Sequence, residues 1–135
     1  MPPSSLTVVV QSRALDRIHY ALMLAASAAA TGAATTLFFA IEGVEALKPG
    51  ALERLTTAAG EAPDAFLGRL AGANAAAPDE LLEALSELGA RFAACDTGLA
   101  VAGASLDDLR KDLKIDVTGL TEILGGAGDG RVIYV

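Results

Sequence analysis

Residues 90–98 read Ala90-Arg91-Phe92-Ala93-Ala94-Cys95-Asp96-Thr97-Gly98, and the predicted fold is built outward from them. Arg91 to Ala94 is typical of a short buried strand, and the residues after Cys95 are typical of a turn into a helix. Cys95 is the only cysteine of the chain and falls at the C-terminal edge of this strand. Because ligands collect where strands end in an open α/β sheet, this turn is the predicted site.

Strands and helices are predicted to alternate along the rest of the chain. The other predicted strands are rich in apolar and β-branched residues and cover residues 6–10, 35–41, 113–117 and 131–135. Some predicted helices show apolar residues at three- and four-residue spacing, and others lie between turn residues. They cover residues 13–31, 44–48, 78–88, 97–103 and 117–124. This alternation predicts an α/β fold with three layers: a mostly parallel sheet of about five strands and helices on both faces, joined by right-handed crossovers.

The chain is predicted to form one domain, because its 135 residues suffice to bury a core. Residues 49–78 lack strong periodicity and contain several Gly and Pro, so they are interpreted as an inserted helical flap with two short helices. Residues 21–41 are uncharged and long enough to span a bilayer, but Gly32 divides them into a helix and a strand. For this reason no stable membrane span is expected. The N-terminal residues 1–5 lack the basic region of a signal peptide, so secretion is not expected either.

The composition excludes several classes of function. The chain has 17 acidic and 10 basic residues, a net charge of −7, which argues against nucleic acid as a partner. A single cysteine cannot form an internal disulfide, which fits a reducing compartment and predicts a cytoplasmic location. One Cys and one His cannot supply a structural zinc site, and neither a metal nor a cofactor is expected. The glycine-rich residues 125–130 lack the Lys-Ser/Thr of a phosphate loop and precede a strand, so they are interpreted as a flexible turn that ends the helix.

Cys95 is the candidate nucleophile, because the thiolate of cysteine is strongly reactive. Backbone amides of Thr97, Gly98 and Leu99 are candidates to stabilise that anion, whereas the Asp96 carboxylate opposes it. The alternative is a buried structural cysteine that behaves as a small hydrophobic residue. Position in the sequence alone favours neither interpretation.

Polar residues at the predicted strand ends are the candidates for binding a ligand. They are Gln11, Ser12, Glu42, Gly43, Asp96, Thr97 and Gly98. Ser12 is also expected to cap the first helix. Glu42, Asp96 and Asp16 are the acids that could form a carboxylate cluster. His19 falls near the middle of the first helix, away from the strand ends, and is expected to lie at the surface or to contact a partner.

Several stretches in order make the chain resemble the DsrE/DsrF-like family of small sulfur-relay proteins, in the branch with a long insert before the third strand. They are Leu6 to Gly32 leading into Thr35-Thr36-Leu37-Phe38-Phe39, the turn Glu42-Gly43-Val44-Glu45-Ala46-Leu47, the helix and strand from Pro78 to Cys95, Leu99-Ala100-Val101-Ala102-Gly103, and the strand Arg131-Val132-Ile133-Tyr134-Val135. The chain departs from the family pattern in two places. Methionines are missing after Cys95, and Ile41-Glu42-Gly43 lacks the usual tryptophan.

The resemblance implies a flavodoxin-like fold, a homo-oligomer, and a persulfide carried on Cys95 between donor and acceptor proteins. The predicted function is therefore sulfur trafficking, with activity as a sulfurtransferase-like carrier at most. The departures from the family leave open a small-ligand-binding or scaffold protein of the same fold. A thiol peroxidase is the third alternative, and it would need an external thiol because the chain has no second cysteine.

Overall fold

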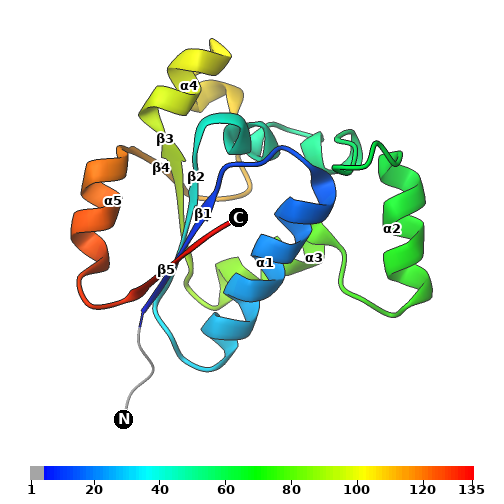
Figure 1. The fold of residues 1–135 in the computed structure, drawn as a ribbon, viewed down its shortest axis with the longest axis horizontal. Coiled ribbons are helices and arrows are strands. Elements are labelled where there is room, and N and C mark those ends of the chain that lie inside the picture. The colour runs from blue at the N-terminus through cyan, green and yellow to red at the C-terminus, as the bar shows by residue number, and fades with distance from the viewer. Residues whose placement is uncertain (1–4) are drawn as a thin grey trace.

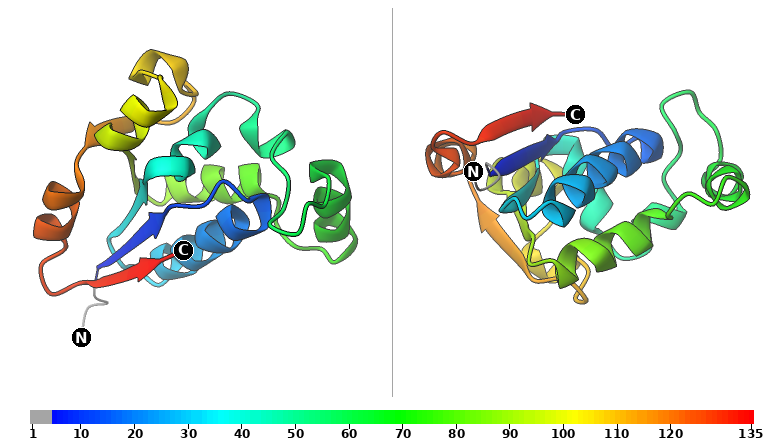
Figure 2. Two further views of the ribbon diagram at one scale, coloured as in Figure 1. Left: turned by 45° about the horizontal axis from the view of Figure 1, so that its top comes forward. Right: turned by 90° about the horizontal axis from the view of Figure 1, so that it is seen from below.

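The structure of the protein is a computed structural model that describes residues 5–135. Most of the N-terminal stretch considered above as a signal peptide therefore lies outside the described residues. Figures 1 and 2 show a central sheet with helices on both sides. The three layers confirm the predicted α/β, flavodoxin-like sandwich.

All strand pairs of the sheet are parallel. The five strands lie in the order β4-β3-β2-β1-β5. Their bounds are β1 (Leu6–Val10), β2 (Thr35–Phe39), β3 (Arg91–Cys95), β4 (Ile115–Thr118) and β5 (Arg131–Tyr134). Since parallel strands run in one direction, all five carboxyl ends lie at the same edge of the sheet.

The two faces of the sheet are covered unequally. Helices α1 (Leu15–Ala30) and α3 (Pro78–Glu87) pack against one face, and α5 (Leu120–Ala127) lies on the other (Figure 1). The first face belongs to the larger apolar core, which takes alternate strand residues such as Val8, Val10, Leu37, Phe39 and Phe92. The α5 face holds a much smaller core of Val9, Phe38, Ala40, Ala93, Cys95 and Ile123.

The remaining elements are short. They are the 3-10 helices η1 (Ile41–Leu47), η2 (Ala51–Glu53) and η3 (Leu106–Asp108), and the helices α2 (Pro63–Gly72) and α4 (Asp96–Ala102). Within the predicted flap, residues 49–78, the structure forms η2 and α2. In Figure 2, α2 lies at one end of the molecule, away from the sheet.

Three local predictions differ from the structure. Helix α1 begins at Leu15 rather than residue 13, so Ser12 lies before the helix, and its hydroxyl accepts the N–H of Ala14 at 3.0 Å instead of capping it. Residues 41–47 form a 3-10 helix that begins at Ile41, earlier than expected. Helix α5 begins only at Leu120 and continues through Gly125 and Gly126 to Ala127, and Gly128 follows it with a positive φ of 55°.

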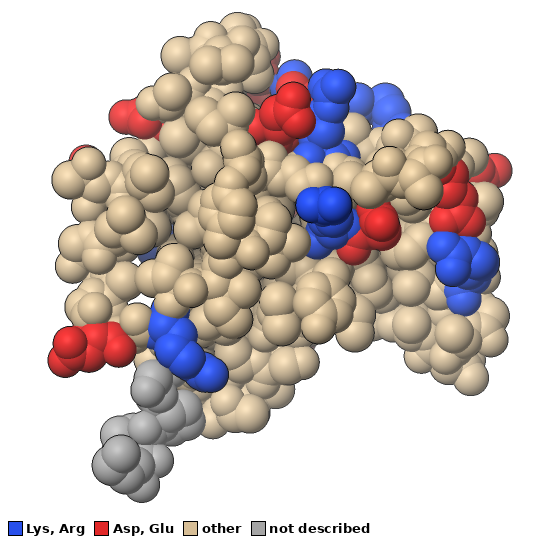
Figure 3. All heavy atoms as spheres, in the orientation of Figure 1, with Lys and Arg blue, Asp and Glu red and all other residues tan. Residues whose placement is uncertain are grey.

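No helix within residues 5–135 is both long and apolar enough to cross a membrane. Residues 21–41 instead form the end of α1, a turn and β2, as the position of Gly32 predicts. On the face drawn in Figure 3, blue and red side chains are interspersed, without a continuous basic surface.

Candidate functional site

Cys95 ends β3, and its side chain lies on the α5 face of the sheet. The residue is only 5% exposed and belongs to the smaller core together with Phe38 and Ile123. Ile123 is the one buried residue of α5, so this single side chain from α5 joins the core that encloses Cys95. The thiol is therefore enclosed at the strand ends, under a helix that is held by little buried surface.

The backbone after Cys95 turns directly into α4 and directs one amide at the sulfur. The N–H of Gly98 donates to Cys95 Sγ at 3.4 Å, so Cys95 is the N-cap of α4. The N–H of Thr97 donates instead to Asp96 Oδ1 at 2.7 Å. Of the three amides considered as anion donors, Gly98 is thus the one that meets the sulfur.

Polar groups of β4 and α5 lie beside this turn. Thr118 is the register partner of Cys95 and is buried, and its hydroxyl donates to Glu122 Oε2 at 2.9 Å. The Asp96 carboxylate lies against the Cα of Gly119. Two carboxylates, of Asp96 and Glu122, therefore belong to the segments that border the thiol.

Two glycines allow the strand ends to approach one another closely. A Cβ on Gly43 would overlap the carbonyl oxygen of Val10, and a Cβ on Gly98 would lie 2.8 Å from the backbone nitrogen of Ile41. Ile41 itself has a φ of 49°, a conformation that a β-branched residue rarely adopts. Such strain persists only where the surrounding structure imposes it, and it is common at functional sites.

A cavity of about 180 Å³ opens beside the close contact between Gly98 and Ile41. Its lining consists of Arg13, Ile41, Glu42, Glu45, Gly98, Val101 and Ala102. Cys95 does not line it, because the sulfur lies on the α5 side of the sheet. The cavity offers one guanidinium, two carboxylates and an apolar wall to a small polar ligand.

The predicted ligand-binding residues divide into groups in the structure. Glu42 and Gly98 meet at the small cavity, whereas Asp96 and Thr97 flank the thiol. Gly43 is buried against Val10 and is not available to a ligand. The other two, Gln11 and Ser12, follow β1, where the Gln11 N–H donates to the carbonyl of Val135 at 2.9 Å. The expected cluster of Glu42, Asp96 and Asp16 does not form around one point, because Asp16 accepts the N–H of Ala58.

Sequence reasoning missed Arg13, Ile41, Thr118, Glu122 and Ile123. Arg13 lies three residues after the end of β1 and Ile41 two residues after the end of β2, so their position after a strand was a usable signal. The other three come from β4 and α5, and only the parallel pairing of Cys95 with Thr118 brings them to the thiol.

His19 is buried, and the expectation of a surface position is wrong. Its Nε2 lies 2.8 Å from the carbonyl oxygen of Ala76, and its ring meets the edge of Phe66 at a centroid distance of 5.7 Å. Both partners belong to residues 49–78, so His19 holds this segment against α1. The sheet separates His19 on α1 from the Cys95 side chain, so no Cys–His pair forms.

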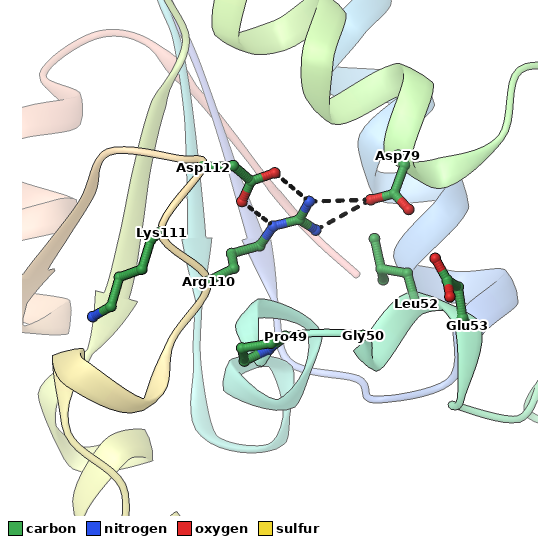
Figure 4. A pocket seen from close by; sticks show the side chains of 8 residues that line it. All are labelled: Pro49, Gly50, Leu52, Glu53, Asp79, Arg110, Lys111 and Asp112. Carbon is green, nitrogen blue, oxygen red and sulfur yellow. Dashed lines mark hydrogen bonds and ion pairs between the residues drawn. The ribbon is translucent and has the colours of Figure 1, made fainter.

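A larger cavity of about 430 Å³ lies elsewhere, among the loops near the start of α3 (Figure 4). Arg110 makes four hydrogen bonds there, two each to the carboxylates of Asp79 and Asp112. The Arg110 guanidinium lowers the pKa of Asp112 through hydrogen bonding, and the same bonds raise the pKa of Arg110. Because these charges satisfy one another, the group joins loops and offers few free donors to a ligand.

No group of three or more His, Cys, Asp or Glu residues within residues 5–135 is placed to hold a metal ion. Thr118 is the register partner of Cys95, Glu122 is hydrogen-bonded to Thr118, and Asp96 follows Cys95 in the chain.

The comparisons with known proteins identify the fold. The structure is similar to the crystal structure of the YchN protein from E. coli, with a TM-score of 0.62 and 14% sequence identity. The match covers 98% of this chain and 99% of YchN, a protein with a DsrE-like fold. No family model matches the sequence, and no curated protein matches it. The chain thus shares the α/β fold of YchN over nearly its whole length.

Proposed function

We propose that the protein is a sulfur carrier in which Cys95 holds sulfane sulfur as a persulfide. The main supporting observation is the hydrogen bond from the Gly98 N–H to Cys95 Sγ at the carboxyl end of β3. This bond orients the sulfur at the strand end, and sulfur exchange proceeds through attack by a cysteine thiolate. The DsrE-like fold of YchN, shared over the chain, supports the same function.

The proposed sulfur transfer needs neither an oxidant nor a reductant. The Cys95 thiolate attacks the outer sulfur of a donor persulfide, the donor S–S bond breaks, and the donor leaves as a thiolate. An acceptor thiolate then attacks the outer sulfur of the Cys95 persulfide, and Cys95 leaves as a thiolate. Neither step needs an acid–base pair, which fits a thiol whose neighbours include no histidine.

The burial of Cys95 requires a local opening before transfer. Of the two helices that border Cys95, α5 is held by fewer buried residues than α4, because Ile123 is its one buried residue. Movement of α5 would uncover the side of the thiol that faces the smaller core. The donor and acceptor are proposed to be proteins that meet the chain at this edge, in the cytoplasm.

Intact-mass measurement tests this function directly. Wild type and Cys95→Ser are incubated side by side with a low-molecular-weight sulfane-sulfur donor, and each is weighed before and after reduction. The expected result is a gain of one sulfur atom on wild type alone, lost on reduction. A folded wild-type protein that gains no sulfur would contradict the proposal.

A second candidate function is that of a ligand-binding or scaffold protein. The supporting observation is the cavity of about 180 Å³ beside Ile41, which is separate from the enclosed sulfur. Its charged residues would bind a small zwitterionic or polar molecule. Ligand affinity that is equal in wild type and Cys95→Ala but is lost in Arg13→Ala would favour this function over the first.

A further inference from the structure

The two outer strands of the sheet differ in how their free edges are protected. On β4, the exposed Asp116 forms an ion pair with Arg91 at 3.1 Å, and the exposed Lys114 precedes the strand. On β5, no charge follows Arg131 in the run Val132-Ile133-Tyr134-Val135. Charged residues on an edge strand prevent it from pairing with another chain. On β5 only the exposed Arg131, at the start of the strand, offers this protection, and no side chain of residues 132–135 is charged.

Within residues 5–135, β5 is an outer strand, and one side of its backbone faces no other strand. The amides of Arg131 and Val135 donate to Ser5 and Val9, and the carbonyl of Val135 accepts the N–H of Gln11. In a parallel ladder these alternate residues face the neighbouring strand. The N–H and C=O groups of Val132 and Tyr134 therefore point outward, along the open edge of the sheet.

Exposed apolar side chains gather beside this edge. Val132 and Tyr134 are 43% and 66% exposed, and they lie on the face that carries α5, since they are the register partners of Thr7 and Val9. Leu120 and Leu124 of α5 are each 50% exposed. At about 100° per residue, both leucines lie on one side of Ile123, which is the β5 side for a right-handed crossover. Figure 3 shows that the surface in front of β5 is largely uncharged.

We propose that β5 pairs antiparallel with β5 of a second copy of this chain, around a two-fold axis at Ile133. The pairing satisfies the outward backbone groups, because Val132 of each copy faces Tyr134 of the other. This pairing joins the sheets of the two copies into one continuous sheet with twice as many strands. The four leucines of the two α5 helices then flank a groove that both Tyr134 side chains enter.

A second copy fits this edge better than another partner for two reasons. The strand is self-complementary, since an aromatic residue faces a β-branched residue in both directions, and such cross-strand pairs are favourable. Each copy also carries a net charge of −7, so two copies repel one another over most of their surface. The uncharged corner of β5 and α5 allows two copies to meet without placing acid against acid. This inference is independent of the sulfur chemistry at Cys95.

The oligomeric state tests the proposal, with a matched pair of variants. Val132 on β5 and Val117 on β4 are 43% and 44% exposed, so Val132→Lys and Val117→Lys place the same charge on opposite edges. Mass is measured by light scattering up to about 0.1 mM, a concentration that saturates a dimer of micromolar Kd. The expected result is an even number of 13.6 kDa chains in wild type and Val117→Lys, and half that number in Val132→Lys. A wild-type monomer, an odd-numbered assembly, or equal masses for the two variants would overturn the proposal.

A cross-link tests the register. Ile133 would face itself across the two-fold axis as a non-hydrogen-bonded pair, with Cα atoms about 4.5 Å apart, within the range that a disulfide spans. Ile133→Cys in a Cys95→Ser background should therefore form a reducible dimer on oxidation, whereas Val117→Cys in that background should remain monomeric on a denaturing gel. Equal cross-linking of the two variants would refute the pairing.

Discussion

Gly43 occupies a position that no larger residue fits. Its missing Cβ leaves room for the carbonyl oxygen of Val10, and this contact joins the end of β1 to η1. We expect Gly43→Ala to lower the free energy of unfolding by about 3 kcal/mol, because backbone must move to relieve the overlap. Urea unfolding followed by circular dichroism measures this change.

Gly68 in α2 provides the control for this substitution. It has open space around its Cα and an ordinary helical φ. Gly68→Ala should raise stability by about 0.5–1 kcal/mol, since alanine favours a helix over glycine. If the two substitutions changed the free energy of unfolding in the same direction and by similar amounts, the close approach of the Val10 carbonyl would not explain why residue 43 is glycine.

The Asp112 carboxylate links stability to acid pH. Hydrogen bonds from Arg110 lower the pKa of Asp112 in the folded state, so its contribution is present above the unfolded value and is lost as the pH falls through the folded value. Because Asp112 is largely exposed, we expect Asp112→Asn to cost less than about 1 kcal/mol at pH 7. The difference between the two proteins should begin to shrink below about pH 3.9, the usual pKa of aspartate, and vanish once the pH lies below the lowered pKa of Asp112 in the folded state. A difference in unfolding free energy that persisted at pH 2 would show that packing, not charge, explains the effect.

The segment of residues 49–78 is held to α1 by a few specific contacts. His19 bonds to Ala76, Asp16 accepts the N–H of Ala58 at 2.9 Å, and the Leu15 N–H donates to Thr56 at 2.9 Å. We expect His19→Ala to cost about 1–3 kcal/mol locally, since a partly buried carbonyl loses its donor and Phe66 loses the ring it meets. Hydrogen exchange should accelerate at residues 61–77 and remain unchanged in β1 and β2. Tyr20→Ala, at an exposed neighbouring position, should leave exchange in both regions as in wild type.

The elements that could be predicted from sequence are those whose pattern is local. Buried strands such as β1, and the stripe of Leu81, Leu82 and Leu85 in α3, carry their burial pattern in consecutive residues. Predictions failed where distant contacts decide the structure. The ring of His19 is buried by Phe66, which lies 47 positions later in the chain, and no local sequence pattern predicts that contact.

The candidate site shows the same division. The place of Cys95 at the end of β3 follows from the local sequence, and so does the turn that brings Gly98 back to the sulfur. The identity of the helix that covers the thiol does not follow from the local sequence. Which helix encloses Cys95 depends on the crossover from β4 to β5 over the opposite face, and this is a property of strand order. A glycine pair at residues 125–126 also concealed the true extent of α5.

The protein has two cores of unequal size on opposite faces of one sheet, and this difference predicts how Cys95 becomes reactive. Leu85 is fully buried in the larger core, whereas Ile123 anchors α5 in the smaller one. Leu85→Ala should lower global stability by about 2–5 kcal/mol. Ile123→Ala should release α5 locally and accelerate alkylation of Cys95 by tenfold or more under native conditions. The measurement is the rate of thiol labelling without denaturant, compared with the unfolding free energy of each variant.

The two variants separate two routes to the thiol. If Cys95 is labelled only in the globally unfolded protein, each variant accelerates labelling in proportion to its loss of stability, and Leu85→Ala has the larger effect. If α5 opens alone, Ile123→Ala has the larger effect although its global loss is smaller, because local opening needs only the contacts of one helix. The second outcome would make α5 the element that admits donor and acceptor to the sulfur. The first would mean that the native thiol is closed, and it would favour the ligand-binding function beside Ile41.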